Sequence, residues 1–459
     1  MQNNNWLDFL KLRASFGLTG RDNVTAWQWM QTYGTDADKG AIFGTNPGDN
    51  TGSHISMNKN NAAINPDAHW DKSYKMNIGV DWNVLRNRLG FNIDYWRQWD
   101  REMLIAFGGS NVPGTVGNQS AALNWGEMDS WGVEFSASWR DKINKDWSYR
   151  IQLNTGYSDN KVRLMEWPTG ASAYTQQQKN GRTDTGLWGM ECIGMFREFN
   201  DIKKFATDYL YQGKDEKGND VYGTYMGLLG DPAKHQIMPG MLIYKDVGSQ
   251  DDNGNHLNTP DKKISAEDDQ VQLAKFKSNP YGITANLGFE WKSLSFSAQL
   301  SASWGGYATY STSITKISTG ELEFMNMPAF WTVDNMFVFD PIYDGPTGYS
   351  MSGNMLVPQN RSGWLPNLAF SDVNGVTSSF WKYSTAQVGL SRVTIAYSLP
   401  KKWMTAIGIQ SCRINVTAQN VVNFINPYPE KFMSATTGNG TYYSYPRLRK
   451  ITLGLNICF

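Results

Sequence analysis

Acidic and amide side chains crowd one segment of the chain, between residues 246 and 269. Its carboxylates include Asp246, Asp261 and Asp268. The same segment contains Asp251, Asp252, Asn253, Asn255, Glu267 and Asp269. Hard oxygen ligands at such close spacing suit Ca²⁺. A solvated acidic loop without a bound ion is the alternative interpretation, and the spacing alone leaves both open.

Aromatic side chains in segments rich in turn-forming residues form a second set that could hold a ligand. Trp and Tyr rings can stack on sugar rings or hold peptide side chains. The candidate substrate-binding residues are Trp125, Trp188, Trp331, Trp364, Tyr442 and Tyr443. Each of them could instead pack one loop against another or contact a partner protein.

The residue types needed for catalysis are sparse and scattered. The histidines are His54, His69, His235 and His256, and none has a carboxylate or Cys at metal-ligand spacing. Cys192, Cys412 and Cys458 match no metal or redox motif. No Ser/His/Asp set or phosphate-binding loop is present. We therefore predict a protein that is not an enzyme and has no cofactor other than a possible structural Ca²⁺.

The overall charge gives no reason to expect a nucleic-acid partner. Lys and Arg balance Asp and Glu, so the formal net charge at pH 7 is +0, and no basic field exists to attract nucleic acid. Mean hydropathy is −0.49, and no stretch has the apolar length of a membrane helix.

The elements that would position the candidate residues are strands with two different faces. In residues 449–459, apolar side chains share one parity and small or polar side chains share the other. The same alternation predicts a strand over 6–18 with an exit at 17–20. It also predicts four hairpins, over residues 74–95, 131–157, 281–304 and 393–418, the last with a turn at 400–406 and a second strand from 407. An apolar lipid-facing set opposite a polar water-facing set is the pattern of a transmembrane β-barrel strand.

Aromatic residues gather at the ends of these runs, and the middle positions are aliphatic or small. The residues concerned are Tyr74, Trp131, Trp139, Trp147, Tyr157, Tyr281, Trp291 and Trp304. Aromatic girdles of this kind flank the apolar band of a membrane barrel. A soluble barrel would scatter its aromatic rings through its core, so the pattern favours a membrane protein.

The lengths of the connections predict an orientation. The four hairpin turns are short, whereas the connections 100–130, 158–280, 305–387 and 420–447 are long and rich in Gly, Asn, Asp, Ser and Pro. Outer-membrane barrels have short periplasmic turns and long outer loops. The predicted fold is thus all-β: an antiparallel transmembrane β-barrel with long extracellular loops, whose region 158–280 could contain further strands near 187–196.

The order of several short segments resembles a known family. They are residues 6–20, 65–66, 112–113, 124–135, 186–196, 239–246, 380–400 and 419–423, with wording such as Asn-Trp-Gly-Glu-Met-Asp-Ser-Trp-Gly from 124 and Pro-Gly-Met-Leu-Ile-Tyr-Lys-Asp from 239. Collinear and spread over essentially the whole chain, they resemble the C-terminal barrel portion of SusC/RagA-family TonB-dependent transporters of the Bacteroidota outer membrane.

The resemblance implies import across the outer membrane. Such barrels take up oligosaccharides or peptides, are powered through TonB, and work with a SusD-like surface lipoprotein that acts as a lid. Residues 1–459 would be the C-terminal part of a large barrel, and the plug domain and TonB box that precede it in the family are absent from this chain. We expect the chain alone not to insert stably in lipid, because two open sheet edges would leave backbone groups unpaired in hydrocarbon.

The resemblance also bears on the acidic segment. Similar family members carry an Asp-x-Asn-x-Asp-Gly-x-Ile-x-x-x-Asp calcium loop here. Asp246 can stand for its first position, and Asp261, Ile264 and Asp268 for later ones. An insertion separates them, and Lys262 replaces the glycine.

Two other classes of function remain in view. A self-contained, smaller outer-membrane porin or adhesive barrel would need an even number of strands that closes within this chain. An outer-membrane enzyme would need catalytic residues on strands at the lumen or rim, and the dispersed histidines disfavour it.

Overall fold

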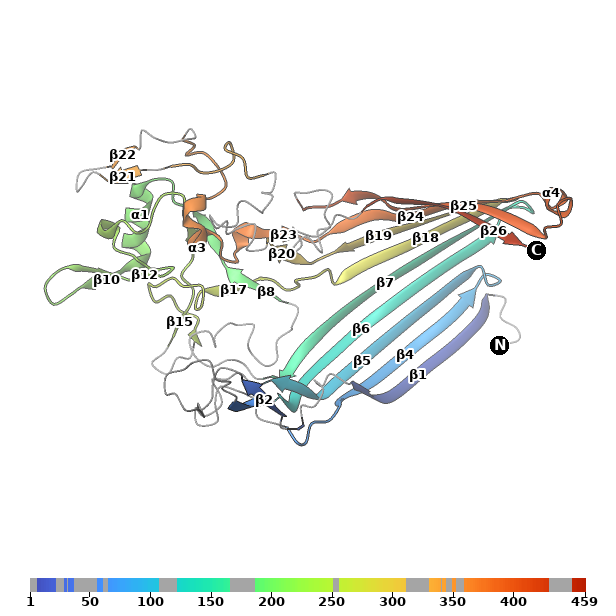
Figure 1. The fold of residues 1–459 in the computed structure, drawn as a ribbon, viewed down its shortest axis with the longest axis horizontal. Coiled ribbons are helices and arrows are strands. Elements are labelled where there is room, and N and C mark those ends of the chain that lie inside the picture. Colours follow the sequence, from blue (N-terminus) through green and yellow to red (C-terminus); the bar gives the residue numbers. More distant parts are fainter. Residues whose placement is uncertain are drawn as a thin grey trace, which may run out of the picture.

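The computed structural model describes residues 6–21, 29–30, 32–36, 56–60, 65–106, 122–165, 186–250, 256–310, 330–339, 341–343, 349–351, 359–428 and 448–459. Ten of its strands form one antiparallel sheet (Figure 1). In spatial order they are β1 (Leu7–Arg21), β4 (Asp71–Val84), β5 (Leu89–Ala106), β6 (Ala122–Lys142), β7 (Trp147–Leu164), β18 (Tyr281–Trp291), β19 (Leu294–Trp304), β24 (Gln387–Ser398), β25 (Ser411–Ile425) and β26 (Lys450–Cys458). The predicted fold class is confirmed: the described chain is mostly antiparallel strand, with one large sheet.

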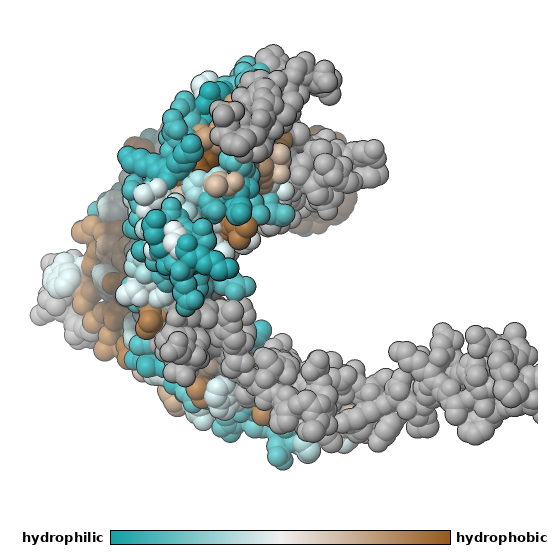
Figure 2. Space-filling model, turned by 90° about the vertical axis from the view of Figure 1, so that its left-hand side faces the viewer, coloured by the Kyte–Doolittle hydropathy of each residue, from teal (hydrophilic) through white to brown (hydrophobic). Residues whose placement is uncertain are grey.

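The sheet is curved, and its two faces differ in chemistry. Along β4 and β5, Ile78 lies opposite Tyr95 and Val80 opposite Ile93 on the outer face, where large apolar side chains are exposed. The intervening residues, among them Asp81, carry polar groups on the inner face because successive side chains of a strand point in opposite directions. In Figure 2 hydrophobic residues gather along the outer side of the wall, which curves around a hollow.

All four predicted hairpins are present, and their turns lie at one end of the sheet. The pairs β4–β5, β6–β7, β18–β19 and β24–β25 are each joined at that end. The N-terminal start of β1 and the C-terminal end of β26 lie at the same end (Figure 1). The long connections lie at the other end, as the sequence predicts.

The fourth hairpin differs from the prediction in detail. Its turn contains a short helix, α4 (Lys401–Thr405), and β25 begins at Ser411 rather than at residue 407. Pro400 immediately precedes the helix, and its fixed φ suits that position. Gly408 adopts a φ of +75°, which ends the helical path. The apolar alternation at 407 and 409 therefore belongs to the turn and not to a strand.

Several strands are longer than their apolar patterns indicate. β1 does not end at 17–20 but pairs with β4 in continuous register as far as Arg21. β5 continues to Ala106, β6 begins at Ala122, and β7 continues to Leu164. The connections are correspondingly shorter than 100–130 and 158–280. These strand ends carry charged side chains, so the apolar alternation stops before the strand does. The backbone pairing continues beyond that point.

The connection from β7 to β18 builds a separate compact unit at the loop end. Its helices are α1 (Phe199–Phe205) and the π-helix η5 (Ala206–Leu210), with the 3₁₀ turn η6 (Pro232–Lys234). Its strand pairs are β8 (Leu187–Met190) with β17 (Gln270–Ala274), β9 (Cys192–Met195) with β14 (Leu242–Tyr244), β10 (Tyr211–Lys214) with β11 (Asp220–Tyr222), β12 (Thr224–Tyr225) with β13 (Leu228–Leu229), and β15 (Ser249–Gln250) with β16 (His256–Leu257). The strands near 187–196 exist, but they pair outside the ten-stranded sheet.

Segments from the β19–β24 connection complete this unit or lie beside it. They are β20 (Tyr307–Thr309), β21 (Pro341–Tyr343), β22 (Tyr349–Met351), η7 (Leu368–Phe370), α3 (Ser371–Asn374), η8 (Ser379–Trp381) and β23 (Lys382–Ser384). A further pair, β2 (Thr32–Asp36) and β3 (Ser56–Asn60), follows β1. We call residues 186–250, 256–276 and 368–381 the loop domain. Among the helices of the described ranges, none combines the length and the apolar character needed to span a membrane.

The loop domain has its own hydrophobic core. Phe196 packs edge-on against Phe205, with ring centroids 5.2 Å apart, and against Tyr225 at 5.9 Å. The Tyr225 hydroxyl donates a hydrogen bond to the carbonyl of Leu242, which satisfies a polar atom in a buried position. Val373 of α3 packs into the same cluster. The core therefore joins two connections that are distant in the sequence.

We expect Phe196→Ala to destabilise the loop domain by about 3–5 kcal/mol, because the ring is 0% exposed and its removal leaves a cavity. Ile193→Ala is the matched control: Ile193 lies three positions earlier, on β9, and is 51% exposed, so the substitution should cost about 0.5 kcal/mol or less. Limited proteolysis of the full-length gene product in membranes measures the difference. Equal cleavage rates for the two variants would contradict this assignment of the core.

Candidate functional site

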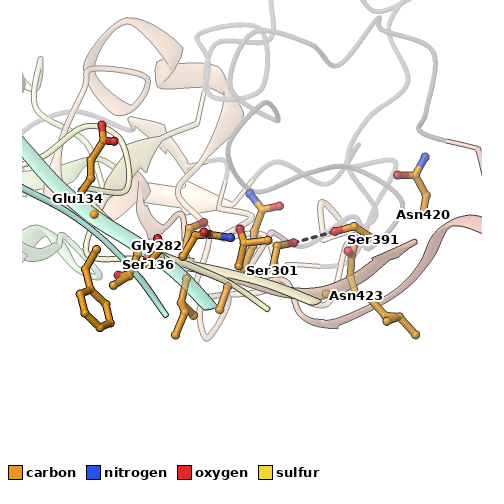
Figure 3. A pocket seen from close by; sticks show the side chains of 18 of the residues that line it. Glu134, Ser136, Gly282, Ser301, Ser391, Asn420 and Asn423 are labelled. Atoms are coloured by element: carbon orange, nitrogen blue, oxygen red, sulfur yellow. Dashed lines mark hydrogen bonds between the residues drawn. The ribbon is translucent and has the colours of Figure 1, made fainter. Parts of the chain in front are cut away.

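A polar groove lies on the inner face of the sheet and is lined by residues of β5, β6, β7, β18, β19, β24 and β25. Its volume is about 670 Å³. Its lining includes Asn154. Figure 3 labels other lining residues, among them Glu134, Ser136, Ser301, Ser391, Asn420 and Asn423. The hydroxyls of Ser301 and Ser391 lie 2.8 Å apart on neighbouring strands and share a hydrogen bond.

The groove offers many hydrogen-bonding groups and one charge, that of Glu134. Amide and hydroxyl side chains both donate and accept hydrogen bonds, so they suit the hydroxyls of a sugar or the amides of a peptide. The sequence marks these residues only as the polar parity of their strands. It does not indicate that seven strands bring them together.

Ion pairs link β1, β4 and β5 on the same inner face. The Arg13 guanidinium on β1 lies 2.9 Å from a carboxylate oxygen of Asp81 on β4 and 2.9 Å from one of Asp94 on β5. Arg13 donates a second hydrogen bond to Asp81 at 3.0 Å and to Asp94 at 2.9 Å, so each ion pair is bidentate. Such paired hydrogen bonds fix the orientation of both groups.

A second cavity of about 610 Å³ on the inner face lies nearer the short turns and is basic. Its lining includes Arg86, Arg88, Arg140, Arg150 and Arg413. The inner face therefore changes along the strands, from neutral hydrogen-bonding groups near the loops to positive charge near the turns.

The acidic segment folds around its own carboxylates. Asp246 accepts hydrogen bonds from the backbone N–H of Lys262 at 2.7 Å and of Asp261 at 3.3 Å. Asp261 in turn accepts from the N–H of Lys263 at 2.9 Å. Asp268 accepts from the Ser265 hydroxyl at 3.2 Å. The candidate ligands Asp246 and Asp261 are thus brought together, with much of their acceptor capacity used by backbone.

Asp269 is the most deeply buried carboxylate in the described part of this segment, at 0% exposure, and the sequence did not single it out. It accepts from the backbone N–H groups of Val247, Gly248 and Ser265 at 2.7, 3.0 and 2.8 Å. Burial raises the pKa of Asp269 to about 6, with a contribution from the nearby Asp246, although these three hydrogen bonds oppose the rise. Burial also raises the pKa of Asp246.

Within the described ranges, no group of three or more His, Cys, Asp or Glu residues is arranged to hold a metal ion. Asp251, Asp252, Asn253 and Asn255 lie outside those ranges. The calcium site at Asp246, Asp261 and Asp268 stays a prediction.

The candidate aromatic residues fall into three groups. Trp188 and Trp331 are buried and pack within the loop-end structures, Trp331 against Trp381 at 6.0 Å between centroids. Trp125 and Trp364 present exposed rings. Tyr442 and Tyr443 lie outside the described residues. Of the four candidate tryptophans that the structure describes, Trp125 and Trp364 are therefore the ones that an arriving ligand can reach.

The fold and its two faces define the architecture: a curved antiparallel wall with an apolar outer face and a polar inner face. No protein-family model matches the chain. Among curated proteins, it is 24% identical over 470 residues to TonB-dependent receptor P3 of Formosa agariphila, covering 100% of this chain and 40% of that protein. It is 22% identical over 463 residues to TonB-dependent receptor SusC of Bacteroides thetaiotaomicron, covering 99% of this chain and 38% of SusC.

Solved structures show the same fold. The RagAB peptide importer in its open-open state superposes with a TM-score of 0.66 at 18% identity, over 100% of this chain and 41% of that chain. Its closed-closed state gives a TM-score of 0.64 at 19% identity. The resemblance inferred from the motifs is confirmed: the chain matches the C-terminal part of TonB-dependent receptors, SusC among them. It spans about two fifths of the length of these relatives.

We expect the loop domain to become less stable as pH rises from 4 to 7. The folded pKa of Asp269, about 6, exceeds the ordinary value of about 4. The folded state therefore binds more protons between those pH values, and deprotonation at higher pH costs about 3 kcal/mol. Hydrogen exchange of residues 245–250 and 264–270 measures this dependence.

Two variants of the full-length protein control that experiment. Asp269→Asn removes the titrating group and should flatten the profile between pH 4 and 6. Glu216→Gln changes an exposed carboxylate of the same domain and should leave the profile intact. A profile that rises with pH in the unmodified protein would overturn the assignment.

Proposed function

We propose that this chain forms the C-terminal part of the barrel of a TonB-dependent importer in the outer membrane of a Gram-negative bacterium. The observation that carries the proposal is the ten-stranded sheet with an apolar outer face, a polar inner face and all its short turns at one end. The match of the whole chain to receptor barrels supports it. The short turns would face the periplasm.

The inner face supports transport rather than catalysis. The large barrel of which this chain would form part needs a plugged lumen. The basic cavity around Arg140, Arg150 and Arg413 provides charged groups that a plug could contact. Energy would come from the inner membrane through TonB, by way of a part of the protein that precedes the barrel. The relatives named above are receptors and importers, in line with a protein that is not an enzyme.

The proposed cargo is an oligosaccharide or a peptide. Both carry dense hydrogen-bonding groups, which the groove around Ser136, Asn154 and Asn423 can satisfy. The exposed ring of Trp364 at the loop end offers a stacking surface for sugars and for apolar peptide side chains. RagAB, which has the same fold, is a peptide importer. The hydrogen-bonding groove and the exposed ring suit sugars equally well, so the proposal keeps both oligosaccharides and peptides as cargo.

The proposed partner is a SusD-like surface lipoprotein seated on the loop end. Exposed apolar side chains of the loop domain support such a contact: Ile193, Tyr209 and Leu229. Large apolar groups at a surface are typical of interaction sites when they cluster. The partner would close over the same end to which Trp364 belongs.

A self-contained porin or adhesive barrel is the other candidate, and the sheet disfavours it. In the described part of the chain, β1 pairs only with β4 and β26 only with β25, so the ten strands form an open wall. A closed barrel made from this chain alone would join β1 to β26.

Uptake by cells that carry the full-length gene tests the proposal. Deletion of the gene should abolish growth on the cargo, and Trp364→Ala should lower cargo affinity about three- to tenfold. The control is Trp403→Ala, because Trp403 is an exposed tryptophan on α4, at the opposite end of the sheet. Candidate glycans and peptides are supplied separately, and the one whose uptake fails identifies the cargo. Growth unaffected by deletion on all of them would refute import.

A further inference from the structure

A basic cluster lies on the outer face of β5, β6 and β7, near their loop ends. We define the outer basic cluster as Arg97, Arg101, Lys161 and Arg163, which surround Asp129. In the sheet register, Arg97 lies opposite Trp131, and Asp129 lies opposite Lys161. Residues two apart on a strand share a face. The cluster thus continues the outer apolar face that contains Ile93 and Val133, and not the polar inner face.

The depth of the cluster follows from the aromatic rows beside it. Tyr157, Tyr281 and Trp304 stack side by side on neighbouring strands, with centroids 5.5 and 6.2 Å apart. A row of aromatic rings marks the level where hydrocarbon meets headgroups. Asp159 and Lys161 follow Tyr157 toward the loops, about 7–14 Å further on at about 3.3 Å per residue. The cluster therefore lies at the level of the outer-leaflet headgroups.

The cluster contains more positive charge than its carboxylates neutralise. Asp129, whose side chain is 2% exposed, lies 2.8 Å from both Arg101 and Arg163 and 3.7 Å from Arg97. Glu127 lies 3.5 Å from Arg101, and Asp159 lies 3.3 Å from Lys275. Lys72, opposite Arg101, is paired with Glu102 at 2.6 Å. The patch holds six cations and four carboxylates. The cations are Arg97, Arg101, Lys161, Arg163, Lys275 and Lys72, and the carboxylates are Asp129, Glu127, Asp159 and Glu102. If each carboxylate neutralises one cation, two positive charges remain.

Arg97 is the residue best placed to take a ligand. Its guanidinium carbon lies 5.0 Å from the centre of the Trp99 ring, and the side chain is 36% exposed. Its Nε is buried and has no hydrogen-bond partner among the described residues. A buried donor without an acceptor is unfavourable, so the protein alone does not satisfy Arg97. The exposed part of its guanidinium is accessible to a ligand from outside. Arg101 and Arg163 already neutralise the single charge of Asp129. The position of Arg97, 3.7 Å from the same carboxylate, is therefore not explained by that ion pair.

We propose that the outer basic cluster binds a phosphate group of a lipid in the outer leaflet. This inference rests on the proposed outer-membrane function. Arginine donors in a fixed fork match the geometry of phosphate oxygens, and the excess charge matches a phosphate anion. The site faces outward at headgroup level, with Trp99 and Trp131 beside it and the apolar belt beneath, where acyl chains would lie. These features favour a lipid phosphate over free phosphate.

The test uses the full-length protein extracted from native outer membranes in mild detergent, with bound lipid quantified by native mass spectrometry. The variant is Arg97→Gln with Lys161→Gln, which leaves Arg101 and Arg163 on Asp129 and so preserves the fold. Retained phosphate-bearing lipid should fall roughly tenfold. Arg140→Gln with Arg150→Gln, which removes the same two positive charges from the inner face, should retain as much lipid as the unmodified protein.

Separate experiments distinguish lipid phosphate from free phosphate. They also distinguish failure of the lipid site from failure of the proposed outer-membrane function. Vesicles with and without phosphorylated outer-leaflet glycolipid, and inorganic phosphate alone, are offered to delipidated protein. Binding of the glycolipid vesicles that the double variant loses supports the proposal. Equal lipid retention in both proteins overturns it, as does binding of inorganic phosphate without lipid. Fractionation is scored independently: absence of the protein from the outer membrane would refute the proposed function instead.

Discussion

In the proposed outer-membrane setting, hydrocarbon offers no hydrogen-bond partner, so backbone groups of the ten-stranded sheet must pair with those of neighbouring strands. This constraint explains why the pairing is so regular. From β4 to β5 and from β18 to β19 the register runs without interruption, in spite of glycine, asparagine and aspartate within the strands. It also explains why β1 continues through Gly17 and Gly20 to Arg21. Within the sheet, the ladder and not local propensity decides where a strand ends.

Continuous pairing in turn assigns each side chain to one of two environments. The outer set forms a belt of aliphatic residues between aromatic rows such as Trp147 and Trp291, whose rings stack at 5.6 Å. The inner set holds the ion pairs of Arg13 and the polar groove around Ser301 and Ser391. At the loop end, segments far apart in the sequence share a second core around Phe196 and Val373. A rigid wall thus carries a folded loop domain where cargo and partner would arrive.

The sequence predicted the wall well, because period-two alternation is a local signal. All four hairpins, the last strand and the gathering of the short turns at one end of the sheet were correct. The ends of strands were not: charged pairs such as Arg101 with Asp129 extend the ladder beyond the apolar pattern, and Ile407 and Ile409 mimic that pattern within a turn. Hydrophobic periodicity detects burial in lipid or protein and is blind to pairing between polar residues.

The candidate site was harder to predict, because its geometry is not local. Trp188 and Trp364 look alike in sequence, yet one is buried and the other exposed, since burial depends on contacts between distant loops. The role of Asp269 depends on three backbone N–H groups, two of which lie more than twenty positions away in the chain. The groove on the inner face requires seven neighbouring strands, which no single segment indicates.

The opposite environments of adjacent residues are the central claim, and site-directed spin labelling of β6 tests it most directly. Val133→Cys and Glu134→Cys would be labelled one at a time in the full-length protein, in membranes, after Cys192, Cys412 and Cys458 are replaced by serine. The account predicts that the label at 133 is relaxed by lipid-soluble oxygen and the label at 134 by a water-soluble nickel complex. Equal access of the nickel complex to both positions would contradict a wall with one face in lipid.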